Sequence, residues 1–424
     1  MSREKALAFL DEHGMTAERI DPLAEARRMV EDMEDGLRRD GAVLPMIPTY
    51  LRTDGQVPLG ACAAVIDAGG TNFRAGLMRM TETGPVISRL VKKKMPGIGQ
   101  PASWEEFISF VADAVEPLMD ETDDIGFCFS YSADITPEID GQVIRIDKEV
   151  VITGSEGKLV GASLIAELER RGISGKHCVI LNDTAAVLLG GSAALDKSRI
   201  GGLIGQVSGT GTNTCCVLPL RRIAKLGREE NTGILVNLES GMYDKLPRGD
   251  FDLLMDRQSN NPGMKWLEKL TAGVYLGELA RLMLVKAGED ALLAPGTKLS
   301  LDALGRFDSA VLDAWACGER LELCAAEDDR AFLQTLAKEL FQRSARAMCA
   351  NLLAILLLTG EGSNPARPVI ICAEGSLVQK GRCYRPALES LLARYTGELG
   401  RHVRLQIGEE TTLPGAGAAA LLNH

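Results

Sequence analysis

The chain has 424 residues, of which 46% are hydrophobic and 25% charged, and its formal net charge is −11. This length and composition predict a globular protein with room for two domains. The negative charge argues against a nucleic-acid partner or an anionic membrane, because only short basic runs such as Lys92-Lys93-Lys94 offset it. The longest apolar stretch, about Ala350 to Leu358, falls short of the roughly 20 residues of a membrane-spanning helix, so a cytoplasmic protein is expected.

The cysteines and histidines show no pattern of a disulfide framework or a metal centre. The ten cysteines are scattered without a CxxC pair, and reduced, mostly buried thiols are expected. The four histidines have no metal-ligand spacing; they are His13, His177, His402 and His424. Any catalytic metal is therefore expected to be held by oxygen ligands.

Helical and strand patterns alternate along the chain, which predicts an α/β protein. Asp21-Pro22 is typical of a helix start, and apolar residues at helical spacing follow it until Gly41. Three strands separated by glycine-containing turns come next and predict an antiparallel meander; they cover 61–67, 72–80 and 86–93. Ser103 and Glu106 form a capping box before a helix that should cover one face of this meander.

The rest of the chain continues the alternation of strands and helices. Strands are predicted at 125–131 and 177–181, with a helix at 161–171 between them. A long helical region at 330–358, a buried strand at 368–372 and a helix from Pro386 to Gly397 follow.

A weak internal repeat is the most informative feature of the sequence. VIDAGGTN (65–72) and QVSGTGTN (206–213) each place a Gly/Thr/Asn turn between two apolar strands, which predicts two related halves. Such turns expose backbone N–H groups and hydroxyls that suit phosphate. Either turn alone is more often an ordinary hairpin, but the pair, with Asp67 in the first copy, favours phosphate binding. Neither a P-loop nor a dinucleotide-binding fingerprint is present.

A third segment, ILNDTAAV (180–187), places Asp183 between a buried strand and a helix. By itself, Asp183 with Thr184 would be an ordinary helix N-cap pair. Together with motifs elsewhere in the chain, this segment forms a series that occurs in the same order in hexokinases. The chain resembles that family from about residue 44 onward. The series is LPMIPTYL (44–51), VIDAGGTNFR (65–74), GFCFSYS (126–132), LNDT (181–184), SGTGTN (208–213), VNLESG (236–241), NPG (261–263), LEKL (267–270), YLGEL (275–279) and EGS (374–376).

The resemblance implies the two-lobed actin-like ATPase (ribonuclease H-like) fold, with the active site in a cleft between the lobes. The smaller lobe is expected at 60–181 plus 414–424, and the larger at 1–59 plus 182–413. The implied reaction transfers the γ-phosphate of ATP, with Mg²⁺, to a hexose hydroxyl, with the 6-hydroxyl of glucose as the first expectation.

The resemblance also implies roles for individual residues. Asp183 matches the catalytic base, and Asp67 matches the carboxylate that serves Mg²⁺ through water. The hexose-contacting positions are Ser130, Lys148, Asn182, Asn213, Glu239 and Glu268. The phosphate-contacting positions are Gly69, Gly70, Thr71, Asn72, Gly209, Thr210 and Gly211, and the adenosine end is Gly375, Ser376, Gly415 and Gly417. In isolation, Lys148 and Glu268 would be read as surface residues.

Several positions depart from the hexokinase pattern and leave sugar and donor preference open. Asp147-Lys148-Glu149-Val150 stands where the family usually has T-K-G-F. Asp147 should face either the sugar or solvent, because successive residues of a strand point to opposite faces and Lys148 is its neighbour. Glu374 replaces an aspartate of the adenosine motif, and Ala416 stands where an arginine is often found.

Three alternatives remain at this point: a kinase that prefers another hexose, a catalytically silent hexose sensor, and an actin-like ATPase that acts on proteins. Retention of Asp67, Thr71, Asp183 and Thr210 argues against the sensor. The sugar-type set of amides and carboxylates argues against the protein-acting ATPase.

Overall fold

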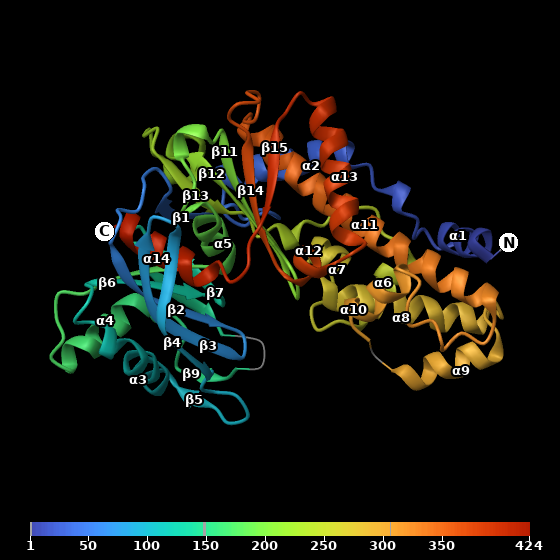
Figure 1. Ribbon diagram of the computed structural model, residues 1–424, viewed down its shortest axis with the longest axis horizontal. Coiled ribbons are helices and arrows are strands. Elements are labelled where there is room, and N and C mark those ends of the chain that lie inside the picture. Colours follow the sequence, from blue (N-terminus) through green and yellow to red (C-terminus); the bar gives the residue numbers. More distant parts are fainter. Residues whose placement is uncertain (1, 147–149, 306) are drawn as a thin grey trace.

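In the computed structural model, residues 2–146, 150–305 and 307–424 are described. The strands form two main sheets, of six and five strands, and two further two-stranded sheets, β5-β9 and β7-β8; helices lie around and between the main sheets (Figure 1). The strands are β1 Ile47–Arg52, β2 Cys62–Gly69, β3 Asn72–Thr81, β4 Gly84–Lys94, β5 Ala102–Ser103, β6 Asp124–Phe129, β7 Ser132–Ile135, β8 Gly141–Arg145, β9 Ile152–Thr153, β10 His177–Leu181, β11 Gly202–Ser208, β12 Thr212–Pro219, β13 Gly233–Asn237, β14 Val369–Glu374 and β15 Val403–Ile407.

The helices include one much longer than the rest. They are α1 Ser2–Glu12, α2 Pro22–Arg38, α3 Trp104–Val115, α4 Val160–Arg170, α5 Asp183–Ser192, α6 Asp250–Gln258, α7 Trp266–Thr271, α8 Gly273–Glu289, α9 Pro295–Leu304, α10 Ser309–Ala316, α11 Glu327–Thr359, α12 Ser376–Lys380, α13 Tyr384–Glu398 and α14 Thr412–Leu422. No helix in the described ranges combines the length and the apolar character needed to cross a membrane.

The two sheets repeat one topology, which confirms the duplication predicted from the paired turns. The small sheet has the order β10-β6-β2-β3-β4, and the large sheet has β1-β13-β12-β11-β14-β15. In each sheet, a hairpin (β2–β3 or β11–β12) is antiparallel, and its first strand also pairs in parallel with a later strand, β6 or β14. The second strand of each hairpin also pairs antiparallel with a third strand, β4 or β13. A second parallel strand, β10 or β15, pairs with β6 or β14.

Two helices, α5 and α14, lie between the sheets and contact each other. α5 packs on β11 and β14, whereas α14 packs on β2 and β6. Glycine allows this close packing: a Cβ on Gly415 would lie 1.9 Å from the Ala186 carbonyl oxygen, and one on Gly126 would lie 1.9 Å from that of Ala416. The small side chains therefore set the distance between the two sheets.

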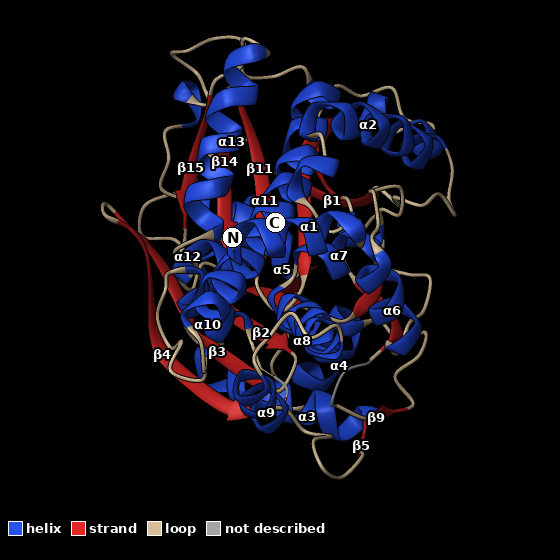
Figure 2. Ribbon diagram, turned by 90° about the vertical axis from the view of Figure 1, so that its right-hand side faces the viewer, coloured by secondary structure: helices blue, strands red, loops and turns tan. Residues whose placement is uncertain are grey.

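The helices outside the sheets agree with the sequence patterns. Asp21 caps α2 by accepting hydrogen bonds from two backbone N–H groups, and the Ser103–Glu106 capping box begins α3. Helix α13 begins at Tyr384, two residues before the predicted start at Pro386. The helix accommodates Pro386 because N–H groups of the first turn have no intrahelical partner to lose. Helices α6 to α10 lie together at one end of the molecule, the end that faces the viewer in Figure 2.

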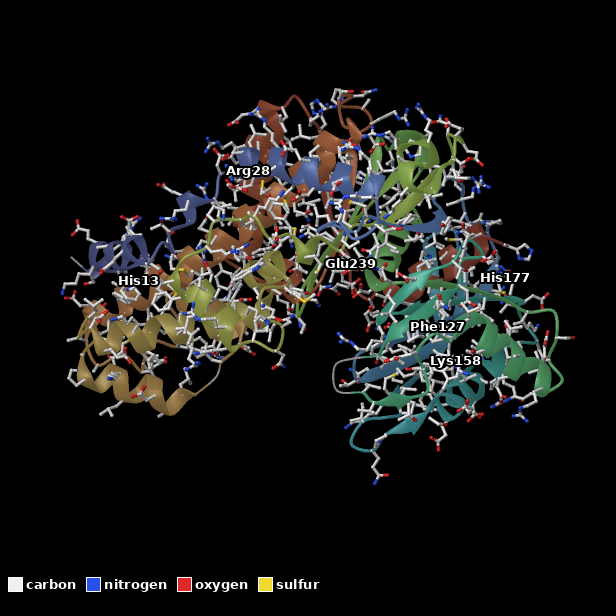
Figure 3. All side chains as sticks on the ribbon, turned by 180° about the vertical axis from the view of Figure 1, so that it is seen from behind. His13, Arg28, Phe127, Lys158, His177 and Glu239 are labelled. Carbon is white, nitrogen blue, oxygen red and sulfur yellow. The ribbon has the colours of Figure 1, made fainter. Side chains whose placement is uncertain are left out.

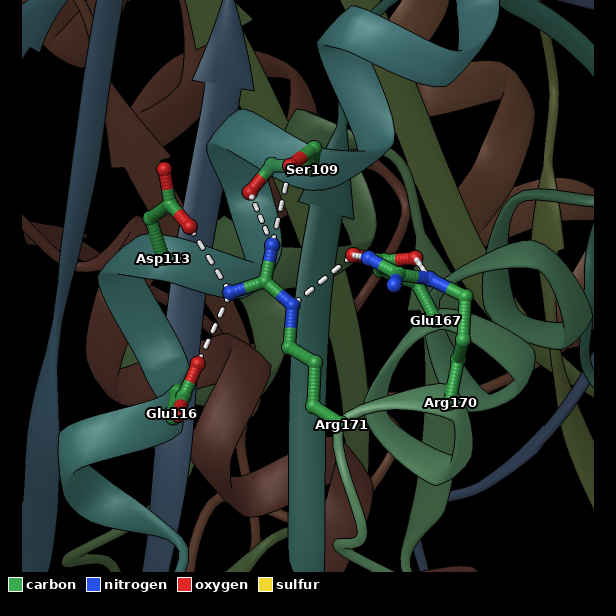
Figure 4. A network of polar contacts seen from close by, with 6 residues as sticks. All are labelled: Ser109, Asp113, Glu116, Glu167, Arg170 and Arg171. Atoms are coloured by element: carbon green, nitrogen blue, oxygen red, sulfur yellow. Dashed lines mark hydrogen bonds and ion pairs between the residues drawn. The ribbon is translucent and has the colours of Figure 1, made fainter.

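Helices α3 and α4 pack together on the small sheet, and a partly buried ionic network joins them (Figure 4). Arg171 Nη1 donates to Asp113 and to Glu116, each over 2.7 Å, and its Nε donates to Glu167 over 2.8 Å. Hydrogen bonds from Arg170 and then Arg171 lower the pKa of Glu167 to about 2. The network therefore stays ionised across the physiological pH range.

All ten cysteines lie in the described part of the chain and are free, and seven of them are buried. Burial raises the pKa of the most enclosed thiols, including Cys349 to about 12 and Cys372 to about 12. Such thiols are poor nucleophiles. The expectation of reduced, mostly buried cysteines agrees with this arrangement.

Candidate active site

The end of β10 places Asp183 at the edge of the small sheet. β10, β6 and β2 run parallel, and their register puts Asp67, Cys128 and Leu181 in one row. Asn182 caps α5 by accepting a hydrogen bond from Ala185 N over 2.9 Å, so Asp183 is the first helical residue. The Thr184 hydroxyl donates to Asp183 Oδ1 over 3.1 Å.

Asp67 forms an ion pair that the sequence analysis did not identify. Its Oδ2 accepts hydrogen bonds from Arg74 Nε over 3.0 Å and from Nη2 over 2.6 Å. Arg74 also donates to the Thr412 hydroxyl over 2.8 Å, at the start of α14. Burial raises the pKa of Asp67; Arg74 offsets part of this rise, and the negative charge of Asp183 adds to it. Asp67 and Asp183 therefore lie close enough to repel each other electrostatically.

The first glycine turn joins β2 to β3 beside these carboxylates. Gly70 has a φ of +79°, in the left-handed region that favours glycine, and it has open space where a Cβ would be. A Cβ on Gly69 would lie 3.2 Å from the Ser130 hydroxyl oxygen. The Tyr131 hydroxyl donates to the Gly70 carbonyl over 2.7 Å, so the chain after β6 supports the turn.

An open pocket extends from this turn along β3 and β4. Its lining contains one carboxylate and four cationic side chains, which suits an anionic ligand. The lining residues are Asp67, Gly69, Asn72, Phe73, Arg74, Lys92, Lys93 and Lys94.

The second glycine turn, between β11 and β12, lies against the start of α12. A Cβ on Gly209 would lie 3.4 Å from Gly375 Cα and from Ser376 N. Gly375 has a φ of +118°, and a Cβ there would lie 2.3 Å from the Ser208 carbonyl oxygen, so this position requires glycine. The structure thus brings the predicted second phosphate turn and part of the predicted adenosine end together, with Thr210 exposed at the tip of the turn.

Carboxylate and amide groups gather at the end of β13. Glu239 Oε1 accepts from Asn237 Nδ2 over 2.7 Å and from Asn213 Nδ2 over 3.3 Å. Glu239 itself has a left-handed backbone with φ +52°, and Figure 3 shows it near the middle of the molecule. Burial raises its pKa; the Asn237 hydrogen bond opposes the rise, and the charges of Asp183 and Glu268 add to it.

Glu268, on α7, lies beside the second turn. Its Oε2 accepts from Thr212 N over 3.2 Å, and a Cβ on Gly211 would lie 3.0 Å from the same oxygen. Lys265 Nζ lies 3.5 Å from Oε1 of this carboxylate. Glu268 is therefore held in the site and is not a surface residue of its helix.

Replacing Glu239 with glutamine is expected to stabilise the free protein while impairing its function. A carboxyl group whose pKa is raised on folding stabilises the fold fully below its ordinary value of 4.5 and loses that contribution as the pH rises through the folded-state value. Glu239→Gln removes this loss, so thermal unfolding at neutral pH should occur at a higher temperature than in the parent, and the difference should shrink toward pH 4. An equal or lower unfolding temperature at pH 7 would contradict the burial argument.

Two residues predicted for the adenosine end lie in α14, and one predicted sugar contact lies outside the described residues. Gly415 and Gly417 are buried in α14, where they contact Ala186 and Met78, so the contacts that the structure gives them are packing contacts. Lys148 lies outside the described residues, as does the neighbouring Asp147.

Three functional candidates were missed although each lies inside or next to a quoted segment. They are Arg74, Asn237 and Lys265. Arg74 had a detectable signal, because the tight turn at residues 70–71 places it directly opposite Asp67 in the hairpin. Asn237 and Lys265 also have partners close in sequence, Glu239 two positions on and Glu268 three positions on, so both pairs had a local spacing that could have been noticed.

Two sheets of one topology, each with a glycine turn, and a group of buried carboxylates beside them characterise the actin-like ATPase class of phosphotransferases. A family model described as hexokinase matches residues 7–193, and a second hexokinase model matches 203–422. The chain therefore belongs to the hexokinase family and is an ATP-dependent hexose kinase.

Individual relatives agree over nearly the full chain. Hexokinase-5 of Oryza sativa subsp. japonica is 30% identical over 93% of this chain and 84% of its own length. A crystal structure of a hexokinase matches with a TM-score of 0.82 and 21% identity, over 100% of this chain and 99% of the other. A hexokinase from Schistosoma mansoni complexed with glucose matches with a TM-score of 0.79 and 21% identity, over 99% and 98%.

Proposed function

We propose that this hexose kinase phosphorylates the 6-hydroxyl of glucose, with Asp183 as the general base. The observation that supports it is the position of Asp183 between two groups of different chemistry. Its charge acts on Asp67, beside the first glycine turn, and on Glu239, in the amide and carboxylate cluster. A hydroxyl held by the cluster would thus lie beside both the base and the phosphate-binding turn.

The base would accept the proton of the sugar hydroxyl while its oxygen attacks the γ-phosphorus. Phosphoryl transfer needs little more from the protein than this proton acceptor, positioning and charge stabilisation. The Thr184 hydroxyl, bonded to Asp183 Oδ1, would orient the carboxylate, and Oδ2 would then be the oxygen that accepts the proton.

The first turn fits a magnesium ion. Asp67 Oδ2 accepts both hydrogen bonds from Arg74. Oδ1 would therefore be the hard oxygen ligand of Mg²⁺, directly or through water. A divalent cation would also offset the repulsion between Asp67 and Asp183. When bound with ATP, it would neutralise phosphate charge. Gly69, Gly70, Thr71 and Asn72, with Gly209, Thr210 and Gly211 opposite, would supply N–H groups and hydroxyls to the phosphates.

The amide and carboxylate cluster would hold the sugar. Glu239 and Glu268 accept hydrogen bonds, and Asn213 presents its amide beside Glu239. Asn182 uses its Oδ1 to cap α5, so it would offer its NH₂ group. Ser130 completes the described part of this set. The S. mansoni hexokinase bound to glucose supports glucose as the first sugar to test.

We further propose that each sheet is the centre of one lobe, 60–181 with 414–424 and 1–59 with 182–413. Closing of the lobes over the sugar would exclude water and so suppress ATP hydrolysis. Helix α14, which contacts both the small sheet and α5, lies where such a movement would pivot.

A coupled assay of ADP release against glucose, mannose, fructose and 2-deoxyglucose tests the proposal. We expect ADP release that depends on sugar and is fastest with glucose. Sugar-independent release would favour an actin-like ATPase, and sugar binding without release would favour a hexose sensor.

Removing the hydroxyls of Thr71 and Thr210 should weaken the use of Mg-ATP more than the binding of sugar. Each Thr→Val change keeps the side-chain volume and deletes a hydroxyl aimed at phosphate, which corresponds to about a ten- to hundredfold loss in kcat/KM for ATP. Thr71→Ser and Thr210→Ser keep the hydroxyl and serve as controls. If calorimetry shows sugar affinity collapsing while ATP kinetics stay normal, the turns have been assigned to the wrong ligand.

A further inference from the structure

Three potential metal ligands meet at the edge of the small sheet opposite to Asp183. Asp124 begins β6, His177 begins the parallel neighbouring strand β10, and His424 follows α14. His424 Nδ1 and Asp124 Oδ1 lie 2.8 Å apart, and the two imidazole rings meet edge to face with centroids 5.9 Å apart. One ligating atom from each of the three side chains lies within 4.8 Å of the other two.

A second observation points to a missing partner at this edge. His177 Nδ1 is buried and has no hydrogen-bond partner among the described residues. Buried polar atoms without a partner are uncommon, because they lose their hydration without a replacement. The His177 side chain, with this unpaired nitrogen, belongs to a cluster that already contains a carboxylate and a second imidazole, a combination that suits a cation.

The charges around the cluster do not repel such a cation strongly. Lys176 is the adjacent basic residue, and its ammonium group donates to Asp123 over 2.6 Å and to the carbonyls of Met119 and Thr122. This ammonium is therefore engaged with other acceptors. Asp123, whose backbone carbonyl accepts a hydrogen bond from His177 N over 2.8 Å, adds a further negative charge beside the cluster.

We propose that Asp124, His177 and His424 bind a divalent transition-metal cation of the zinc class. Two imidazoles and one carboxylate are a ligand set that zinc, cobalt and nickel accept, with water in the remaining positions, whereas magnesium and calcium prefer oxygen ligands alone. Binding would require the exposed His424 side chain to move so that all three ligand atoms, now within 4.8 Å of one another, reach bonding distance of one ion. Figure 3 shows His177 near one side of the molecule and Glu239 near its middle, so this site is separate from the proposed catalytic site.

Such a cation would attach the end of α14 to the starts of β6 and β10. The opposite end of α14 carries Thr412, which bonds to Arg74 beside Asp67. The metal would therefore fix the helix between the sheets from the end farther from the active site, and its role would be structural. β10 spans five residues, which separates the two sites by roughly 13 Å along the strand.

Titration of the full chain, freed of metal with a chelator, with Co²⁺ and with Zn²⁺ in competition with a chromophoric chelator tests the site. We expect one equivalent per chain at micromolar Kd or tighter, with a cobalt absorption band of protein-ligated metal. His424→Gln and His177→Gln should each weaken binding at least tenfold. His402→Gln, at another exposed histidine, should leave it unchanged. Zinc should raise the unfolding temperature of the parent but not of His424→Gln.

The proposal fails if binding is substoichiometric or millimolar, or if His402→Gln weakens it as much as His424→Gln does. Far-UV circular dichroism checks the fold of each variant. Should His177→Gln not fold, the exposed His424 decides the question alone, because its side chain is 69% accessible and its replacement leaves the core intact.

Discussion

Replacing Asp183 with alanine should lower kcat for glucose phosphorylation by about 10²–10⁴-fold, the usual contribution of a general base. Sugar binding should remain measurable, because the amide and carboxylate cluster around Glu239 is held by Asn237 and Asn213 and not by Asp183. Steady-state kinetics give the loss of turnover, and calorimetry of glucose binding gives the second quantity.

Two further readouts separate loss of the base from general damage. The charge of Asp183 raises the pKa of both Asp67 and Glu239, so its removal should lower both and shift the acid limb of the residual activity to lower pH. Asp183→Asn keeps the shape of the side chain and should lose turnover to a similar extent. A variant with near-normal turnover would exclude Asp183 as the base.

Replacing Lys269 with methionine should lower the free energy of unfolding by about 3–5 kcal/mol, because it leaves a carboxylate with little solvent access and without its cation. The Lys269 side chain is 0% exposed and donates to Asp256 over 2.6 Å and to the Asn261 carbonyl over 2.8 Å. Asp256 also accepts from Gly263 N over 2.9 Å. The pair thus fixes the segment that leads to Lys265 and Glu268, so KM for the sugar should rise as well.

Urea denaturation measures the stability change. Lys286→Met on α8 is the matched control, since it breaks a solvent-exposed pair with Asp290 and should cost no more than about 0.5 kcal/mol. Adding Asp256→Asn to Lys269→Met removes the uncompensated charge and should recover part of the loss. Equal losses for the two lysine variants would show that burial of the Lys269 pair does not contribute as argued.

The sequence alone determined features that depend on residues close together in the chain. The alternation of apolar residues gave the strands, side chains three positions apart gave the cap of α3, and the two Gly/Thr turns predicted a duplicated hairpin, which the sheets confirm. Motifs in a fixed order pointed to the hexokinase family. These signals are local, because hydrogen bonds within a turn or cap involve only a few successive residues.

Only the tertiary structure decided which distant side chains meet. Arg74 bonds to Thr412 across 338 positions, and Asp124 meets His424 across 300, although the histidine spacing in the sequence had argued against a metal centre. The packing of α14 against the small sheet brings both pairs together, at opposite ends of one helix. Gly415, predicted from its motif to lie at the adenosine end, packs against Ala186 in α5. Sheet register and helix packing set such contacts, and they arise from burial of the whole core, which no short segment encodes.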